Sequence, residues 1–219
     1  MLLVAHRTPA SAARCAHLAA AGAALFEVDV QLRAGHVAVS HYLPLGPAGR
    51  LQRDNWRLRW HTRSRRDPAL DQVDAVVPPG CRVLLDVKES TAARRRALVD
   101  ALAEELPERA RYVLCSPQPD DLERARAAGF ATWRTVRDRL ELAAALDGRD
   151  RLADGAVTIR HSLLDARTLE RLQERAGTVV AWTVNDPERA RELRRLGVDG
   201  VTTDRLAVLH ELAPEAHGN

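Results

Sequence analysis

The sequence alternates short runs of β-branched and aliphatic residues with longer stretches of helical period, and this alternation constrains the fold most strongly. Such alternation is typical of β/α units that build a parallel sheet. The predicted strands are residues 2–6, 25–30, 37–41, 82–87, 112–116, 131–135, 156–161, 178–184 and 200–204. The predicted helices are residues 10–21, 91–106, 120–128, 134–146, 164–175 and 187–196, with a last one that begins at Arg205.

One link in this series is too short for a helical crossover. Residues 30–37 contain the turn signal Ala34-Gly35, so we predict that residues 25–41 form a β-hairpin. The return arm of this hairpin is not a parallel strand, and eight parallel strands are left. Eight is the number that closes a TIM (β/α)8 barrel. We therefore predict an α/β TIM barrel with an extra hairpin arm after the second strand, and keep an open, doubly wound sheet as the alternative.

Residues 42–80 interrupt the alternation. Seven arginines lie between positions 50 and 66, interleaved with Trp56 and Trp60. We predict an irregular, Arg/Trp-rich insertion within a single barrel domain that spans residues 1–219. The insertion is either a basic, aromatic-lined wall for a phosphate-bearing substrate or a solvated loop that its tryptophans anchor to the barrel.

Composition excludes several classes of partner. The net charge of +3 is the difference between 33 basic and 30 acidic residues, so no global field favours a nucleic acid or a membrane surface. No apolar run approaches the roughly 18 residues of a membrane span. The three cysteines form no CxxC pair, which indicates a reducing compartment. We expect a soluble, cytoplasmic protein with no nucleic-acid partner and no membrane span.

In barrels, reactive side chains lie at the carboxyl ends of the strands. The first strand ends in His6-Arg7, and the second carries Glu27 and Asp29 on one face because their spacing is i, i+2. Antiparallel pairing in the hairpin returns His41 to the same rim. Histidines, an arginine and two carboxylates are therefore predicted to converge at one end of the barrel.

Later strands add further polar groups at this end. The strand at 82–87 carries Asp86 and is followed by Lys88, which is the only lysine in a chain rich in arginine. A compact ammonium beside a carboxylate suits a phosphate group. The last two strands lead to Asn185 and Asp204. Taken alone, His6 or Asp204 is more often a cap or a satisfied polar group than a catalytic residue.

These motifs together resemble those of the glycerophosphodiester phosphodiesterase family. The matching segments are VAHR from Val4, FEVDV from Phe26, VSH from Val39, LDVK from Leu85, VAWTVN from Val180 and GVDGVTTD from Gly197. Their order and spacing match over nearly the whole chain, and the last two segments are the most specific. The resemblance implies a TIM-barrel hydrolase of lipid and glycerol metabolism that uses a divalent metal. Its reaction would cleave glycerophosphodiesters, which are small molecules, to sn-glycerol 3-phosphate and an alcohol.

The resemblance also implies roles for the residues at the strand ends. Glu27, Asp29 and Asp86 would ligate the metal, and their oxygens favour Mg²⁺ or Ca²⁺ over zinc. His6 and His41 would divide the general acid and general base roles.

Other residues would contact the phosphoryl group and the glycerol part of the substrate. Arg7 and Lys88 would bind the substrate and stabilise charge on its phosphoryl group. Trp182 would wall the glycerol side of the substrate, or would be a core tryptophan of a barrel strand.

The chain departs from the family pattern at several positions. Thr8 replaces the glycine of His-Arg-Gly, the residues after it lack an acidic group, Tyr42 replaces the aspartate of His-Asp, and Asp86 is one methylene shorter than glutamate. These departures motivate an alternative function, a degenerate barrel that binds a phosphate-containing ligand without catalysis. A third hypothesis is an unrelated phosphosugar barrel enzyme that uses only the Gly-Val-Asp-Gly end of the chain.

Overall fold

The computed structural model describes residues 1–8, 11–33, 35–40, 43–44, 50–54, 57–61, 68–147 and 155–213, with the backbone alone for 43–61. The strands are β1 (Leu2–Ala5), β2 (Leu25–Arg33), β3 (His36–Val39), β4 (Leu43–Pro44), β5 (Arg50–Asp54), β6 (Arg57–His61), β7 (Arg82–Val87), β8 (Tyr112–Ser116), β9 (Ala131–Val136), β10 (Ala156–Arg160), β11 (Thr178–Trp182) and β12 (Gly200–Thr203). The helices are α1 (Ala12–Ala20), α2 (Leu70–Asp74), α3 (Ala92–Glu105), α4 (Pro119–Ala127), α5 (Arg139–Leu146), α6 (Ala166–Gln173), α7 (Pro187–Leu196) and α8 (Leu206–Leu212). Two short 3-10 turns span Arg109–Arg111 and His161–Leu163.

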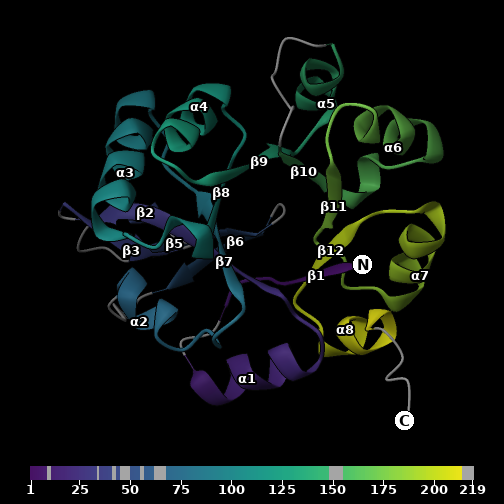
Figure 1. The fold of residues 1–219 in the computed structure, drawn as a ribbon, viewed down its shortest axis with the longest axis horizontal. Coiled ribbons are helices and arrows are strands. Elements are labelled where there is room, and N and C mark those ends of the chain that lie inside the picture. The colour runs from purple at the N-terminus through teal and green to yellow at the C-terminus, as the bar shows by residue number, and fades with distance from the viewer. Residues whose placement is uncertain are drawn as a thin grey trace.

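Eight parallel strands close into a ring. Their order is β1-β12-β11-β10-β9-β8-β7-β2, and β1 also pairs with β2. The closing pairs are Val4 with Leu25 and Ala5 with Phe26. Figure 1 shows the helices arranged around the outside of this ring. The predicted TIM barrel is confirmed, and closure rules out the open, doubly wound alternative.

The predicted hairpin arm is also confirmed. β3 runs antiparallel to the last four residues of β2, and the turn contains Gly35 with a φ of +85°. Between its contacts with β1 and β3, the edge of β2 accepts two backbone hydrogen bonds. Thr8 donates to the carbonyl of Glu27 and Ser40 donates to that of Asp29, both at 2.8 Å. β2 therefore changes partner along its length, and β3 lies outside the ring.

The barrel has an apolar interior at its base. Alternate strand residues point inward and form a small cluster of buried residues: Val4, Leu25, Leu84, Val113, Cys115, Trp133, Ala156 and Val180. A larger cluster includes Val83 and Leu85 of β7 with Leu98 and Leu102 of α3, and it joins the sheet to the helical layer. Inward-facing residues nearer the carboxyl ends of the strands are polar, so the two ends of the barrel differ.

One predicted helix boundary needs correction because it moves a residue of the site. The predicted helix at 134–146 begins only at Arg139, since β9 continues to Val136. The Asp138 carboxylate accepts hydrogen bonds from the backbone N–H groups of Leu140 and Glu141, which fixes the start of α5. By contrast, α7 spans the predicted residues 187–196, with Asp186 as its cap and Pro187 in its first turn.

The region expected to be an irregular insertion contains more regular structure than its sequence suggests. β4, β5 and β6 form a separate three-stranded antiparallel sheet, and α2 follows before β7. The alternation of arginine with apolar and polar residues has no clear period, so the sequence pattern did not identify these strands. Trp56, one of the two tryptophans proposed to anchor this region, lies outside the described residues. None of the described helices is long and apolar enough to cross a membrane.

Gly200 allows the close packing of β12 between β1 and β11. A Cβ atom at this position would lie 2.9 Å from the Leu2 carbonyl oxygen and 3.1 Å from Cγ2 of Val180. We expect Gly200→Ala to destabilise the fold by about 1 to 3 kcal/mol, because backbone must move to admit the methyl group. Urea unfolding measures the effect. Gly177→Ala is the matched control, since nothing lies within 4 Å of its added Cβ. Equal midpoints for the two variants would contradict this account of barrel closure.

Candidate active site

A cavity of about 370 Å³ opens at the carboxyl ends of the barrel strands. Its floor includes Leu84, Cys115, Thr135, Thr158 and Thr202, which lie on β7, β8, β9, β10 and β12. Its walls are formed by His6, Arg7, Glu27, Asp29, Asp86, Lys88, Arg137, Trp182, Thr183, Asn185 and Asp204. The cavity therefore gathers the inward-facing residues above the apolar base of the barrel.

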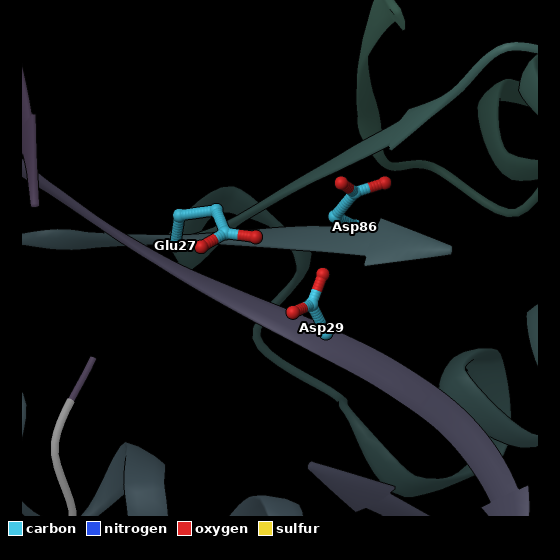
Figure 2. A group of neighbouring side chains, drawn as sticks. All are labelled: Glu27, Asp29 and Asp86. Atoms are coloured by element: carbon cyan, nitrogen blue, oxygen red, sulfur yellow. The ribbon is translucent and has the colours of Figure 1, made fainter. Parts of the chain in front are cut away.

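Three carboxylates share one side of this cavity. Glu27 and Asp29 come from β2 and Asp86 from β7, where Asp29 and Asp86 are direct register partners. One oxygen of each carboxylate lies within 4.8 Å of the others. Figure 2 shows the three groups facing a common space. The shorter Asp86 side chain thus still reaches the cluster.

The cluster is electrostatically unfavourable without a positive charge. Glu27 and Asp29 are each only 4% exposed. Burial first, and then the neighbouring charge of Asp29, raises the pKa of Glu27 to about 7. Burial also raises the pKa of Asp86, although the Lys88 ammonium opposes this shift. Oxygen ligands gathered in this way suit a hard divalent cation.

Lys88 provides positive charge beside two of the carboxylates. Its Nζ lies 3.2 Å from Oδ1 of Asp29 and also forms an ion pair with Asp86. Burial lowers the pKa of Lys88, but the attraction of Asp86, Asp29 and Glu27 outweighs burial and raises it well above its usual range. Lys88 therefore stays protonated at the edge of the cluster.

The segment after β1 is tied to β2 through Glu27. Arg7 has a left-handed backbone with a φ of +53°, and its N–H donates to Oε2 of Glu27 at 2.8 Å. The Thr8 hydroxyl donates to the Glu27 backbone carbonyl at 2.9 Å. Thr8, the residue that replaces the family's glycine, therefore helps to fix the strand that carries two of the three carboxylates.

His6 is oriented by Asp204. His6 Nδ1 lies 2.7 Å from Oδ1 of Asp204, and Asn185 Nδ2 donates to the other Asp204 oxygen at 2.7 Å. The Asp204 backbone N–H donates in turn to Oδ1 of Asn185 at 2.9 Å. The other ring nitrogen of His6, Nε2, lies 3.9 Å from Oε2 of Glu27. Asp204 thus holds the imidazole with Nε2 directed at the carboxylate cluster.

The contact between His6 and Asp204 shifts the pKa of each group. Burial lowers the pKa of His6, but the charges of Glu27 and Asp204 outweigh it, so the net shift is upward from 6.5. Burial raises the pKa of Asp204, yet its contact with His6 outweighs burial and lowers the value to about 2. Asp204 is thus an anion that stabilises the imidazolium form of His6.

Seven of the eight predicted site residues line the same cavity: His6, Arg7, Glu27, Asp29, Asp86, Lys88 and Trp182. The eighth, His41, lies outside the described residues, although its neighbour Ser40 is bonded to Asp29 as the hairpin register requires. Trp182 lies under the guanidinium of Arg160, at 5.7 Å from the ring centroid. Its indole N–H is buried and has no hydrogen-bond partner within the described part of the chain.

Two functional candidates were missed at the level of sequence. Asp204 was treated as an isolated strand-end carboxylate, although its place in the Thr-Asp segment of the family pattern was a signal. Arg137 was hidden inside the predicted helix at 134–146, and it lines the cavity only because β9 continues to Val136.

A closed β/α barrel that gathers carboxylates, basic groups and a histidine at the carboxyl ends of its strands has the architecture of a TIM-barrel enzyme. The chain belongs to the Glycerophosphoryl diester phosphodiesterase family, whose model matches residues 10–208. Membership makes it an enzyme of the phosphoric diester hydrolase class. No curated protein sequence matches the chain.

Solved structures share the fold at low sequence identity. A phosphodiesterase from Oleispira antarctica, in complex with the product sn-glycerol-3-phosphate, is 18% identical with a TM-score of 0.72, covering 97% of this chain and 96% of that one. A glycerophosphodiester phosphodiesterase from Thermotoga maritima is 20% identical with a TM-score of 0.69, covering 97% and 98%. One from Agrobacterium tumefaciens is 15% identical with a TM-score of 0.66, covering 96% and 97%.

The Asp204 contact predicts a measurable change in His6. We expect Asp204→Asn to lower the pKa of His6, because it removes a negative charge in direct contact with the ring. NMR titration of the ring protons in chelator-treated protein measures this value. Asp165→Asn is the control, since Asp165 only caps α6 and asparagine caps helices equally well. An unchanged His6 titration in the Asp204 variant would show that this carboxylate does not set the charge of the ring.

Proposed function

We propose that this enzyme hydrolyses glycerophosphodiesters to sn-glycerol 3-phosphate and an alcohol, and that the reaction depends on Mg²⁺ or Ca²⁺. The observation that carries the proposal is the single cavity that joins the carboxylate cluster to Lys88, Arg7 and His6. Family membership and the product bound in the Oleispira antarctica structure support the same substrate class.

Glu27, Asp29 and Asp86 are the proposed metal ligands. All their donor atoms are oxygens, which Mg²⁺ and Ca²⁺ prefer. Burial and the charges of Asp29 and Asp86 raise the pKa of Glu27 despite nearby His6 and Lys88, and a divalent cation would favour the ionised carboxylate. When bound, such a cation withdraws charge from a phosphate oxygen and so eases attack on phosphorus.

The remaining residues of the site stabilise negative charge on the phosphoryl group and transfer protons. Lys88 and Arg7 bind the phosphoryl oxygens and stabilise the negative charge that grows on them. His6 and His41 divide two proton transfers: one takes the proton of the attacking hydroxyl, and the other gives a proton to the oxygen of the leaving alcohol. The attacking group is water or the neighbouring 2-hydroxyl of the glycerol. In the second case departure of the alcohol leaves a cyclic phosphate, and water then adds to its phosphorus and breaks the P–O2 bond, with the proton transfers reversed, to give sn-glycerol 3-phosphate. Asp204 keeps Nε2 of His6 directed into the cavity throughout.

We also propose which residue positions the glycerol and in which compartment the enzyme acts. Trp182 lines the cavity and offers an apolar face to the glycerol carbons. We place the enzyme, as a single domain over residues 1–219, in the cytoplasm, and its three free cysteines agree with a reducing compartment. The reach of Asp86 into the cluster favours catalysis over the alternative of a degenerate barrel that only binds a phosphate-containing ligand.

Metal-dependent product release tests the proposal. We expect a chelator to abolish release of sn-glycerol 3-phosphate from glycerophosphodiesters, and added Mg²⁺ or Ca²⁺ to restore it. In the same assay His6→Ala is expected to lower kcat by roughly 10² to 10⁴ because it removes proton transfer. Phosphate binding without release under any metal condition would instead support the non-catalytic alternative.

The Lys88→Arg substitution tests whether the reaction requires a lysine at position 88 or only a basic residue. Arginine is the natural basic residue in this chain, but a planar guanidinium is broader than the ammonium that fits between Asp29 and Asp86. We expect turnover to fall roughly a hundredfold, the scale for loss of one preorganised donor, with the variant still folded. Activity and melting temperature are measured together, and parental values of both would contradict the assigned role.

A further inference from the structure

Three residues lie at the ends of neighbouring strands on a second side of the cavity, where Arg137 and Trp182 line it and Arg160, on the strand between them, does not. Arg137 follows β9, Arg160 ends β10 and Trp182 ends β11. Arg160 is the register partner of Trp182, and Val136 is the partner of Ile159, so all three residues lie at one level of the barrel. In the order of the ring, β9 and β10 lie across from β1 and β2. We call these three residues the β9–β11 wall.

Arg137 is held firmly in this wall by Glu141. The Arg137 backbone N–H donates to Oε2 of Glu141 at 2.7 Å, and Nε donates to Oε1 at 2.9 Å. Nη2 also bonds to the same carboxylate. Among the residues that the structure describes, Nη1 has no hydrogen-bond partner. A guanidinium fixed through two of its nitrogens presents the third as a preorganised donor for an anion.

The charges that line the cavity are divided between its two sides. The four carboxylates among the lining residues come from β2, from β7 and from the end of β12. None of the lining residues described on β8 to β11 is acidic. Arg160 adds a second guanidinium to the β9–β11 wall, stacked over the Trp182 ring. Arg137 is paired with Glu141, so the excess positive charge near this side belongs to Arg160, and Arg137 contributes its Nη1 donor to the cavity. The proposed mechanism uses neither arginine.

The substrate explains what such a wall can recognise. The glycerol half of a glycerophosphodiester is uncharged and is common to the whole class, whereas the alcohol on the other side of the phosphate varies in charge. Trp182 faces the glycerol half in the proposed function, and Arg137 lies two strands away from it along the ring. We propose that Arg137 is a specificity-determining residue that binds an anionic group on the leaving alcohol. This inference rests on the proposed function. The preferred substrates are then diesters whose alcohol carries a phosphate or a carboxylate, and an alcohol with a quaternary ammonium is disfavoured.

Four diesters of sn-glycerol 3-phosphate test this preference. Their alcohols are choline, glycerol, glyceric acid and glycerol phosphate, so one half of the substrate stays constant while the charge of the other half changes. We expect kcat/KM to be roughly 10- to 100-fold higher for the two anionic esters than for the choline ester, mainly through KM. Comparison of the glyceric acid and glycerol phosphate esters distinguishes a carboxylate from a phosphate as the better ligand. The preference should weaken as ionic strength rises.

Substitutions of Arg137 test whether this residue causes the preference for anionic esters. Arg137→Gln is expected to lower kcat/KM for the anionic esters roughly 10- to 100-fold more than for the glycerol ester. Arg137→Lys keeps the charge without the fork and should recover part of the preference. Arg139→Gln is the matched control, because Arg139 is exposed on α5 and does not line the cavity. It should leave the ratios between substrates unchanged.

Calorimetric binding of the same four diesters separates this inference from the proposed function. Release of glycerol 3-phosphate at equal kcat/KM from all four, or unchanged ratios in Arg137→Gln, overturns the inference and leaves the function standing. No release from any diester, with anion binding that still depends on Arg137, overturns the function alone. No release and no dependence of binding on Arg137 overturns both.

Discussion

Two backbone pairs between β1 and β2 close the barrel, and the site depends on that closure. These pairs use only the first two residues of β2 on this edge, and β3 pairs with its last four residues through the hairpin. Closure fixes which residues of β2 face inward, because side chains alternate along a strand. Glu27 and Asp29 therefore face the interior together, opposite the register position that holds Asp86. The segment after β1 then brings His6 beside Asp204 at the end of β12.

This geometry places three carboxylates in a small buried space, where they repel one another and lose hydration. The neighbouring donors of the chain offset this electrostatic cost only in part. Lys88 pairs with Asp29 and Asp86, whereas Glu27 receives a single backbone N–H from Arg7. Its pKa is raised to about 7, so the folded state binds a proton that the unfolded state releases near 4.5. Without a cation, stability is then lost as pH rises between these two values. The divalent cation that we propose for this cluster would bind the ionised form and reverse this dependence, which would couple folding of the site to metal.

Much of this arrangement was predictable because it follows from local pattern. Alternation located all eight barrel strands, and the short link with Gly35 identified the hairpin. The position of Arg137 was not predictable, because the predicted strand at 131–135 and the predicted helix at 134–146 overlapped, and only pairing of β9 with β10 extends the strand to Val136. The partnership of Asp204 with His6 joins residues 198 positions apart, and only closure of the ring brings them together. His41 remains a prediction from the hairpin register.

The departures from the family pattern acquire a physical meaning in this context. Thr8 bonds to the carbonyl of Glu27, so the residue in place of glycine tightens the attachment of β2. Asp86 is shorter than glutamate, but direct register with Asp29 brings its oxygens into the cluster. These two departures therefore lie on the side of the ring that holds the carboxylates and keep their geometry, whereas Tyr42 lies outside the described residues. β9 and β10 supply none of the three carboxylates of the cluster. Side chains there can change without loss of the carboxylate geometry, which makes that half of the rim the place where substrate preference can be set.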